Sequence, residues 1–191
     1  EGKATIYEGG IRVPFIVRWP GTVRSGTVSA ALGTVEDIYP TFLDIAGVPI
    51  PRERKIDGVS LVPVLAGNRE SVRESVFLQW EGAMVRQGDY NLIEFPPYYP
   101  TSEEVEGARI KSGKKKVKFS PPLPKKLRIE LYNLSTDIGE ARNIAAENPG
   151  TVKKLRRALH DWIKEMHGTE NYSLDRVRGD AKKLGQEYPD P

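Results

Sequence analysis

The residues that could take part in chemistry are few and lie near the two ends of the sequence. Lys3, Glu8 and Arg12 stand near the start, and His160 and His167 stand near the end. A lysine ammonium is a compact charge with three donors, and it suits an oxyanion whose charge grows during a reaction. A lysine taken alone is usually an ordinary surface residue. Lys3 therefore needs further support before it can be assigned to a site.

The other charged residues near the start have simpler interpretations. Gly9 and Gly10 could form a phosphate-binding loop, but a lone Gly-Gly pair is weak evidence for one, and a tight turn leading into the next element is preferred. Glu8 and Arg12 could contact a substrate, although we expect them to pair or cap within the fold. These four residues are consequently interpreted as structural.

Histidine and cysteine usage narrows the chemistry further. His160 and His167 could share one face of a helix, yet no third ligand accompanies them, so no metal site is expected. His167 near a helix C-terminus suits the helix dipole without any other role. The sequence has no cysteine, which excludes a disulfide, a thiolate metal site and a cysteine nucleophile within these residues.

The formal charge of +3 is concentrated in one stretch, residues 111–128. A solvated loop is the usual explanation of such a run, and a rim that attracts a polyanionic substrate is the functional alternative. Phe119 is the only aromatic residue interleaved with the charges, so we expect no nucleic-acid partner. The basic residues are Lys111, Lys114, Lys115, Lys116, Lys118, Lys125, Lys126 and Arg128.

Composition indicates a globular chain, with 38% hydrophobic and 29% charged residues. No apolar run approaches the roughly 18–20 residues that cross a bilayer, so no membrane partner is expected. The sequence opens at Glu1 without an initiator methionine, which suggests a piece of a longer protein. Localisation cannot be read from such a start.

The first regular element is predicted to be a strand. Ile11–Trp19 is rich in β-branched and aromatic residues, and Pro20 and Gly21 supply a turn signal after it. Pro14 removes a backbone donor, so the regular part should begin at Phe15. A run that is apolar on both faces predicts a strand buried inside a sheet and covered by neighbours.

Two short helices should follow this strand. One spans Asp37–Ala46, with Asp37 as its cap and Gly47 as its stop; the other spans Ser60–Ala66 and ends at Gly67. The first helix carries an apolar stripe at helical spacing, made of Ile38, Phe42 and Ile45.

From Ser75 onward the pattern predicts an antiparallel meander closed by a helix. The expected strands are Ser75–Trp80, Ala83–Arg86, Tyr90–Phe95 and Ile129–Tyr132. The helix should begin at Pro149, end before Gly168 and bury Val152, Leu155, Leu159, Trp162 and Met166. A four-stranded antiparallel sheet packed on this C-terminal helix would form a small α+β unit, with Trp80 and Trp162 in its core.

Four segments in order, within residues 2–146, carry a family resemblance. The matching segments are Gly2–Pro14 with Arg18–Gly21, Asp37–Gly47 with Asp57–Leu61, Val85–Ile93, and Glu130–Leu134 with Asp137, Gly139, Glu140 and Asn143. Together they resemble the C-terminal third of a type I sulfatase, of the alkaline-phosphatase-like superfamily. Tyr90, Asn91 and Ile138 depart from the family pattern at positions expected to be structural.

The resemblance implies a division of the chain. Residues 1–70 would be the C-terminal end of a large catalytic α/β domain, containing the buried strand and the short helices. Residues 71–168 would be the small α+β domain, with an insertion at 96–128. Residues 169–191 would be a tail.

The resemblance also implies chemistry. Sulfatases use a formylglycine made from a Cys/Ser-x-Pro-x-Arg motif, beside a calcium ion held by Asp and Asn side chains. This sequence lacks the motif, since its nearest match, Ser120–Pro124, has no arginine. Both cofactor sites are therefore expected in the parent enzyme outside this chain, and no cofactor is expected on the chain itself. Lys3 matches the family lysine that contacts the sulfate group.

These observations predict the C-terminal part of a sulfatase that hydrolyses sulfate esters and is inactive alone. Its partners would be a sulfated small molecule or polysaccharide and the rest of the parent enzyme, in a periplasmic, secreted or lysosomal location. Two alternatives stay open: a stand-alone, non-catalytic interaction module with the same fold, and a phosphatase or phosphonate hydrolase of the same superfamily. A Cys/Ser-x-Pro-x-Arg motif upstream of Glu1 would favour the sulfatase.

Overall fold

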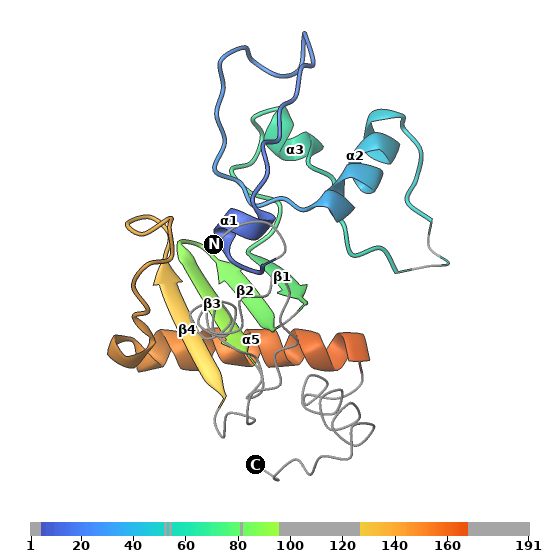
Figure 1. Ribbon diagram of the computed structural model, residues 1–191. Helices are drawn as coiled ribbons and strands as arrows, with labels where there is room; N and C mark the ends of the chain where they lie inside the picture. The colour runs from blue at the N-terminus through green and yellow to red at the C-terminus, as the bar shows by residue number, and fades with distance from the viewer. Residues whose placement is uncertain (1–4, 52, 54, 81, 96–126, 168–191) are drawn as a thin grey trace, which may run out of the picture. The chain divides into compact units, whose positions relative to one another are not determined.

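The structure is a computed structural model that describes residues 5–51, 53, 55–80, 82–95 and 127–167 (Figure 1). The chain forms two compact units. The first contains residues 1–11, 77–85 and 89–191, and the second contains residues 12–76 and 86–88. Lys3, most of the predicted insertion and the predicted tail lie outside the described residues.

A four-stranded antiparallel sheet forms the centre of the first unit, as predicted. Neighbouring strands follow one another in sequence because short turns connect the first three; Gly88, with φ of 57°, occupies the turn between the second and third strands. The fourth strand begins at Arg128, the last residue assigned to the insertion. The strands are β1 Ser75–Gln79, β2 Ala83–Gln87, β3 Tyr90–Phe95 and β4 Arg128–Asn133.

Helix α5, Pro149–His167, covers one face of this sheet (Figure 1). Leu155, Leu159 and Ile163 lie on one side of the helix and pack against Leu92 and Leu131 of the strands. The predicted helix and its core face are thus confirmed, except that Ile163 replaces the exposed Met166 in the core. A short 3-10 helix, η2 Ala145–Glu147, precedes α5.

The two tryptophans behave differently. Trp162 of α5 stacks on Phe77 of β1, with ring centroids 5.2 Å apart and planes 9° apart, as expected for a core residue. Trp80 is 66% exposed, so its assignment to the core was wrong. Its backbone N–H bonds the carbonyl of Gly82 at 2.9 Å, which places Trp80 in the turn after β1 rather than on a sheet face.

The opposite face of the sheet is covered by residues 5–11, which we call the N-terminal segment. Ile6 is only 1% exposed and packs in a second apolar cluster of buried residues. One helical turn, α1 Glu8–Ile11, follows it, so the predicted Gly-Gly turn is a turn of helix. The remaining members of the cluster are Met84, Ile93, Phe95, Tyr132 and Leu134.

The second unit contains the short helices η1 Val35–Asp37, α2 Ile38–Ile45 and α3 Val62–Leu65. Asp37 is fully buried and does not cap α2 through its side chain, contrary to expectation. Since η1 starts one turn earlier, the Asp37 carboxylate instead accepts the backbone N–H of Thr34 and of Val59, each at 2.8 Å, and the guanidinium of Arg73. One buried carboxylate therefore ties three stretches of this unit together.

Local signals set the limits of the other short helices. Gly47 follows α2 with φ of 66°, and Gly67 follows α3 with φ of 74°, so both predicted stops are confirmed. The Ser60 hydroxyl accepts the backbone N–H of Val62 at 3.2 Å, near the start of α3. Both helices are shorter than predicted, because their first residues adopt 3-10 or irregular conformations.

The apolar stripe of α2 is not buried within the described residues. Phe42 is 65% exposed, and Ile38 and Ile45 are also exposed, whereas Pro40 and Thr41 are buried. The Thr41 hydroxyl accounts for its burial, since it donates to the carbonyl of Asp37 at 2.6 Å and accepts the N–H of Leu61 at 2.9 Å. Helix spacing was predicted well, but the face that α2 presents to its own unit was not.

The buried strand predicted within Ile11–Trp19 is absent from the described structure. Residues 12–19 have no regular conformation, and Val13, Phe15 and Ile16 are exposed, the last by 90%. A strand exists only when a neighbouring strand satisfies its backbone groups. Among the described residues no strand lies beside this segment. The apolar pattern of this segment therefore does not lead to a strand in the described structure.

No helix among the described residues is long and apolar enough to cross a bilayer.

Candidate functional site

The N-terminal segment begins two residues after Lys3, the lysine singled out by the sequence. Lys3 itself lies outside the described residues, so its surroundings are not described. The structure does describe how residues 5–11 are held against the sheet. Three contacts fix successive residues of this segment: the packing of Ile6, the hydroxyl of Tyr7 and the backbone N–H of Glu8.

The first polar contact joins Tyr7 to β4. The Tyr7 hydroxyl donates to Oε2 of Glu130 at 2.7 Å, and the Tyr132 hydroxyl donates to the same oxygen at 2.8 Å. Arg128 forms an ion pair with the other carboxylate oxygen, Nε to Oε1 at 2.9 Å. Burial, reinforced by the Glu130 charge, raises the pKa of Tyr132, so this hydroxyl stays a donor. The Tyr7 ring also packs 5.9 Å from the ring of Phe95.

The second polar contact joins Glu8 to Glu140. The backbone N–H of Glu8 donates to Glu140 Oε2 at 2.7 Å, and the side-chain amide of Asn91 donates to Glu140 Oε1 at 2.7 Å. Burial raises the pKa of Glu140; the two hydrogen bonds oppose this rise, and the charge of Glu8 adds to it. Glu140 therefore links the N-terminal segment to β3 through both of its oxygens.

A tight loop presents Glu140 to the segment. Asp137 accepts the backbone N–H of Ala141 at 3.0 Å and of Arg142 at 2.9 Å, and these bonds lower the pKa of Asp137. Glu140 itself has φ of 54°, the only positive φ among the described non-glycine residues. Few residues other than glycine adopt this region, so the loop around Glu140 is locally costly.

Gly10 lets the segment fold back on itself. A Cβ at this position would collide with the backbone carbonyl and the side chain of Thr5. Only glycine fits, because the chain approaches itself at that point without room for a side chain. Gly10 thus has a structural role, as interpreted from the sequence.

His160 and His167, the two histidines considered in the sequence analysis, each contact a side chain of the four-stranded sheet. His160 Nε2 lies 3.0 Å from Oε2 of Glu94 on β3, and Arg156 NH2 lies 3.2 Å from Oε1 of the same carboxylate. His167 Nε2 lies 2.7 Å from the side-chain oxygen of Gln79. Burial alone would raise the pKa of Glu94, but the contacts with His160 and Arg156 outweigh it and lower the pKa.

The described residues do not fit the cofactors that the resemblance implies. They contain no group of three or more His, Cys, Asp or Glu side chains that could hold a metal ion. The hard oxygen donors that calcium requires are therefore not gathered among them. The sequence likewise has no cysteine that could become a formylglycine. We derive no catalytic step through either group from this chain.

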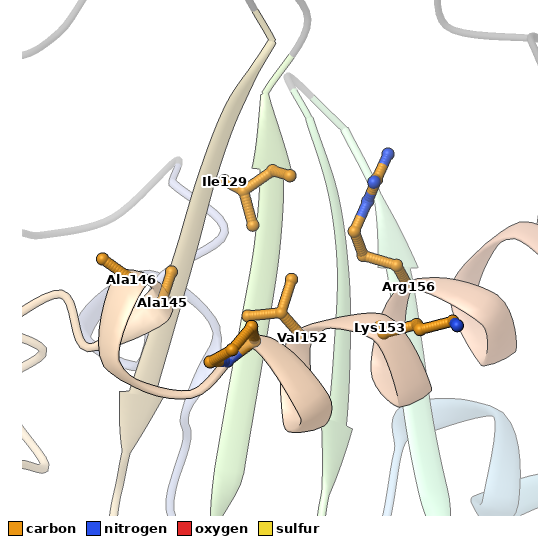
Figure 2. A pocket seen from close by; sticks show the side chains of 7 residues that line it. Ile129, Ala145, Ala146, Val152, Lys153 and Arg156 are labelled. Carbon is orange, nitrogen blue, oxygen red and sulfur yellow. The ribbon is translucent and has the colours of Figure 1, made fainter.

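A hollow of about 490 Å³ lies beside α5. Figure 2 shows the side chains of Ile129 and Val152 directed toward each other in it, with Lys153 and Arg156 also on its lining. Ile129 belongs to the core on the α5 face of the sheet, whereas the N-terminal segment packs with the other core. The hollow therefore lies on the face of the sheet opposite to the N-terminal segment.

Sequence reasoning singled out Lys3, whose role stays a prediction, but it missed the residues that hold the N-terminal segment. Tyr7, Glu130 and Glu140 all stood within the matching segments, yet nothing in their local pattern showed that they meet. Asn91, a departure from the family pattern, is fully buried and holds Glu140. Of the other departures, Tyr90 packs against the α5 core and Ile138 is exposed. Arg12 is exposed.

The comparisons with known proteins agree with this architecture. The family model described as N-sulphoglucosamine sulphohydrolase, C-terminal, matches residues 2–169. Dog arylsulfatase G is 30% identical over 92% of this chain, and human arylsulfatase A is 32% identical over 83% of it. The chain therefore belongs to the family of sulfatase C-terminal domains. It covers 32% and 31% of those two relatives, about a third of their length.

A solved structure gives the same result. A protein in complex with its substrate D-glucosamine-2-N,6-O-disulfate superimposes with a TM-score of 0.62 and 26% identity. The match covers 87% of this chain and 31% of that protein. A Bacteroides thetaiotaomicron protein of glycosaminoglycan metabolism matches with a TM-score of 0.59 and 25% identity, over 81% of this chain and 29% of its own.

Proposed function

We propose that this chain is the C-terminal part of a sulfatase that hydrolyses sulfate esters, and that Lys3 binds the sulfate group of the substrate. The observation that carries the proposal is the fixing of residues 6, 7 and 8 to the small sheet, immediately after Lys3. A site lysine on a loose terminus would contribute little, because its charge would not be held in place.

The chemical role proposed for Lys3 follows from the substrate. A sulfate ester is an anion, and negative charge grows on the oxygen that leaves when the sulfur–oxygen bond breaks. An ammonium held near that group stabilises the transition state more than the ground state. The small domain contributes by restricting where the ammonium can go.

The proposal assigns the nucleophile and the metal ligands to residues outside this chain. Its support is the sequence, which contains no Cys/Ser-x-Pro-x-Arg motif. In the family, formylglycine supplies the attacking hydroxyl and calcium supplies positive charge beside the sulfate. The 191-residue chain is accordingly proposed to be inactive by itself.

The proposed substrate class is a sulfated sugar. The 26% identical protein was solved with a disulfated glucosamine, and a Formosa agariphila relative, 31% identical over 86% of this chain and matched over 35% of its own length, is named an ulvan-active sulfatase. The basic residues between 111 and 128 would favour approach of a polyanionic chain. They lie almost wholly outside the described residues, so this part rests on the sequence.

Lys3→Ala in the full-length protein tests the proposal. We expect kcat/KM for a sulfate ester to fall more than about tenfold, because a charge-assisted contact to the transition state contributes on the order of 2–4 kcal/mol. The melting temperature should stay unchanged. Lys154→Ala, on the exposed side of α5, is the matched control and should keep full activity.

Two results would overturn the proposal. One is unchanged sulfatase kinetics in the Lys3→Ala protein at normal thermal stability. The other is turnover of phosphate monoesters by the full-length protein without any turnover of sulfate esters, which would move the chain to a different reaction class.

A further inference from the structure

We propose that Glu140 is a positioning residue for the sulfate-binding segment, acting on Lys3 through its hydrogen bond to the backbone of Glu8. The inference rests on the proposed function of Lys3. Glu140 does not touch the substrate in this scheme. It fixes residues 5–11, the segment that follows Lys3 in the chain.

The first argument is geometric. Glu140 Oε2 accepts the Glu8 backbone N–H at 2.7 Å, while Oε1 accepts the Asn91 side chain at 2.7 Å. Asn91 is fully buried in β3, so the carboxylate is fastened to the sheet at one end and to the segment at the other. Charge-assisted bonds of this length are among the stronger hydrogen bonds in proteins. The N-terminal segment is therefore held in place by its connection through Glu140 to β3.

The second argument is the backbone of Glu140. Its φ of 54° lies in a region that side-chain-bearing residues adopt at a cost, and Gly139 next to it has no positive φ. Asp137 holds the loop from the other side through the N–H groups of Ala141 and Arg142. A costly conformation that is maintained by its surroundings is a common mark of a functional position. Here it aims the carboxylate at the N–H of Glu8.

The third argument is the polarity of the surroundings. Glu8 is nearly buried, and its charge disfavours ionised Glu140. The side-chain oxygen of Asn91 is buried and has no hydrogen-bond partner among the residues that the structure describes. A cluster chosen for stability alone would avoid both features, since a buried polar atom without a partner is unfavourable. A role for Glu140 in fixing the N-terminal segment explains why both unfavourable features are present.

A double-mutant cycle in the full-length sulfatase tests the inference. Lys3→Ala, Glu140→Gln and the double variant are compared by kcat/KM for a sulfate ester. Glutamine keeps the shape of the side chain but weakens its acceptor and removes its charge. We expect Glu140→Gln alone to lower kcat/KM by about tenfold or more, because small misplacements of a site group have such effects.

The effect of Glu140→Gln in the Lys3→Ala background distinguishes a positioning role from general destabilisation of the fold. If Glu140 acts through Lys3, Glu140→Gln should have almost no further effect in the Lys3→Ala background. Glu147→Gln is the matched control, since Glu147 lies in the same region of the sequence but is exposed and pairs with Arg142 instead. Its kcat/KM should equal that of the unmodified protein.

Hydrogen exchange gives a readout besides activity. In Glu140→Gln, amides of residues 5–11 should exchange faster, while those of α5 residues 155–163 keep their protection. Glu140→Asn guards against misfolding, because asparagine tolerates a positive φ but is too short to reach Glu8. It should keep the melting temperature within a few degrees and still lose activity.

Three outcomes would overturn the inference. Fully additive effects of Lys3→Ala and Glu140→Gln would make Glu140 merely structural. Unchanged exchange of residues 5–11 in Glu140→Gln would show that the bond to Glu8 does not hold the segment. A neutral Lys3→Ala would remove the proposed function itself, and the inference with it, and is recognised separately because it needs no Glu140 variant.

Discussion

The hydroxyl of Tyr7 lies 2.7 Å from Oε2 of Glu130, a residue 123 positions further along the chain. Tyr132 donates to the same oxygen at 2.8 Å, but it belongs to the same strand as Glu130. One carboxylate oxygen thus receives one donor from the N-terminal segment and one from the sheet. The two tyrosines form a natural pair for comparison.

We predict that Tyr7→Phe and Tyr132→Phe lower stability to a similar extent but differ in their effect on activity. Each should lower the free energy of unfolding by about 1.5–3 kcal/mol, since each loses a hydrogen bond to a charged group. Only Tyr7→Phe should also reduce kcat/KM of the full-length protein, because only Tyr7 ties the segment after Lys3. Urea unfolding and steady-state kinetics on both variants check this. Equal activity losses in the two variants would contradict it.

A second prediction concerns Glu94 and acid stability. Its pKa is lowered in the folded state by His160 and Arg156, so its stabilising contribution is present above the unfolded-state pKa of about 4.3 and is lost as pH falls through the folded value. Glu94→Gln should therefore reduce the free energy of unfolding by about 1.5–3 kcal/mol at pH 7. The difference from the unmodified protein should shrink as the pH falls below the unfolded-state pKa.

Urea unfolding at a series of pH values measures this difference. Glu147→Gln serves as the control because its exposed ion pair with Arg142 contributes little at any pH. A Glu94→Gln difference that stays constant as the pH falls well below the unfolded-state pKa would mean that the carboxylate is not held by its cations.

Glycine substitutions provide a third prediction. Gly10→Ala should lower the free energy of unfolding by about 1–3 kcal/mol, because the new methyl group collides with Thr5 and displaces the segment. Gly150→Ala, at the start of α5, meets no atom within 4 Å and should be neutral or stabilising by up to about 1 kcal/mol. Thermal unfolding of the two variants side by side checks the contrast. Tolerance of alanine at both positions would refute the close approach.

A fourth prediction concerns the stretch between β3 and β4. Phe95 at the end of β3 pairs with Arg128 at the start of β4, so the two strand ends are adjacent. An Asn-Gly pair in place of residues 96–127 can therefore close the hairpin. We expect the melting temperature to change little, as the sequence suggested for a solvated insertion. A large loss of stability would show that the replaced residues belong to the core.

The fifth prediction is that the purified 191-residue chain does not turn over nitrocatechol sulfate. The reason is the absence of a formylglycine precursor motif from its sequence. The assay compares the chain with a mock purification and with the full-length protein. Turnover above the mock level would mean that these residues contain a nucleophile of another kind.

Elements whose signals are local could be predicted from the sequence. The strands from Ser75 onward and α5 have strong alternating or helical patterns, and none of their bounds differs from the prediction by more than one residue. Gly47 and Gly67 stop their helices because positive φ is a local requirement. The family resemblance, confirmed by the match over residues 2–169, also came from contiguous motifs.

Features that need a distant partner could not be predicted in the same way. The apolar pattern of Phe15–Trp19 suggests a strand, but a pattern cannot supply the neighbour that makes one. The contacts of Tyr7 with Glu130 and of Glu8 with Glu140 join residues more than a hundred positions apart. Helical spacing in α2 gave the helix, yet the hydrogen bonds of Thr41 decided which face turned inward.

The wide sequence separation of the segment's contacts has a consequence for biosynthesis. Residues 5–11 leave the ribosome before Glu130 and Glu140, which follow more than a hundred residues later. The segment must therefore wait, without its permanent partners, until the translating ribosome has passed position 140 and the last strand has emerged. Chaperones have that interval in which to hold it. A nascent chain interrupted before that point would lack Glu140, the carboxylate that accepts the backbone N–H of Glu8.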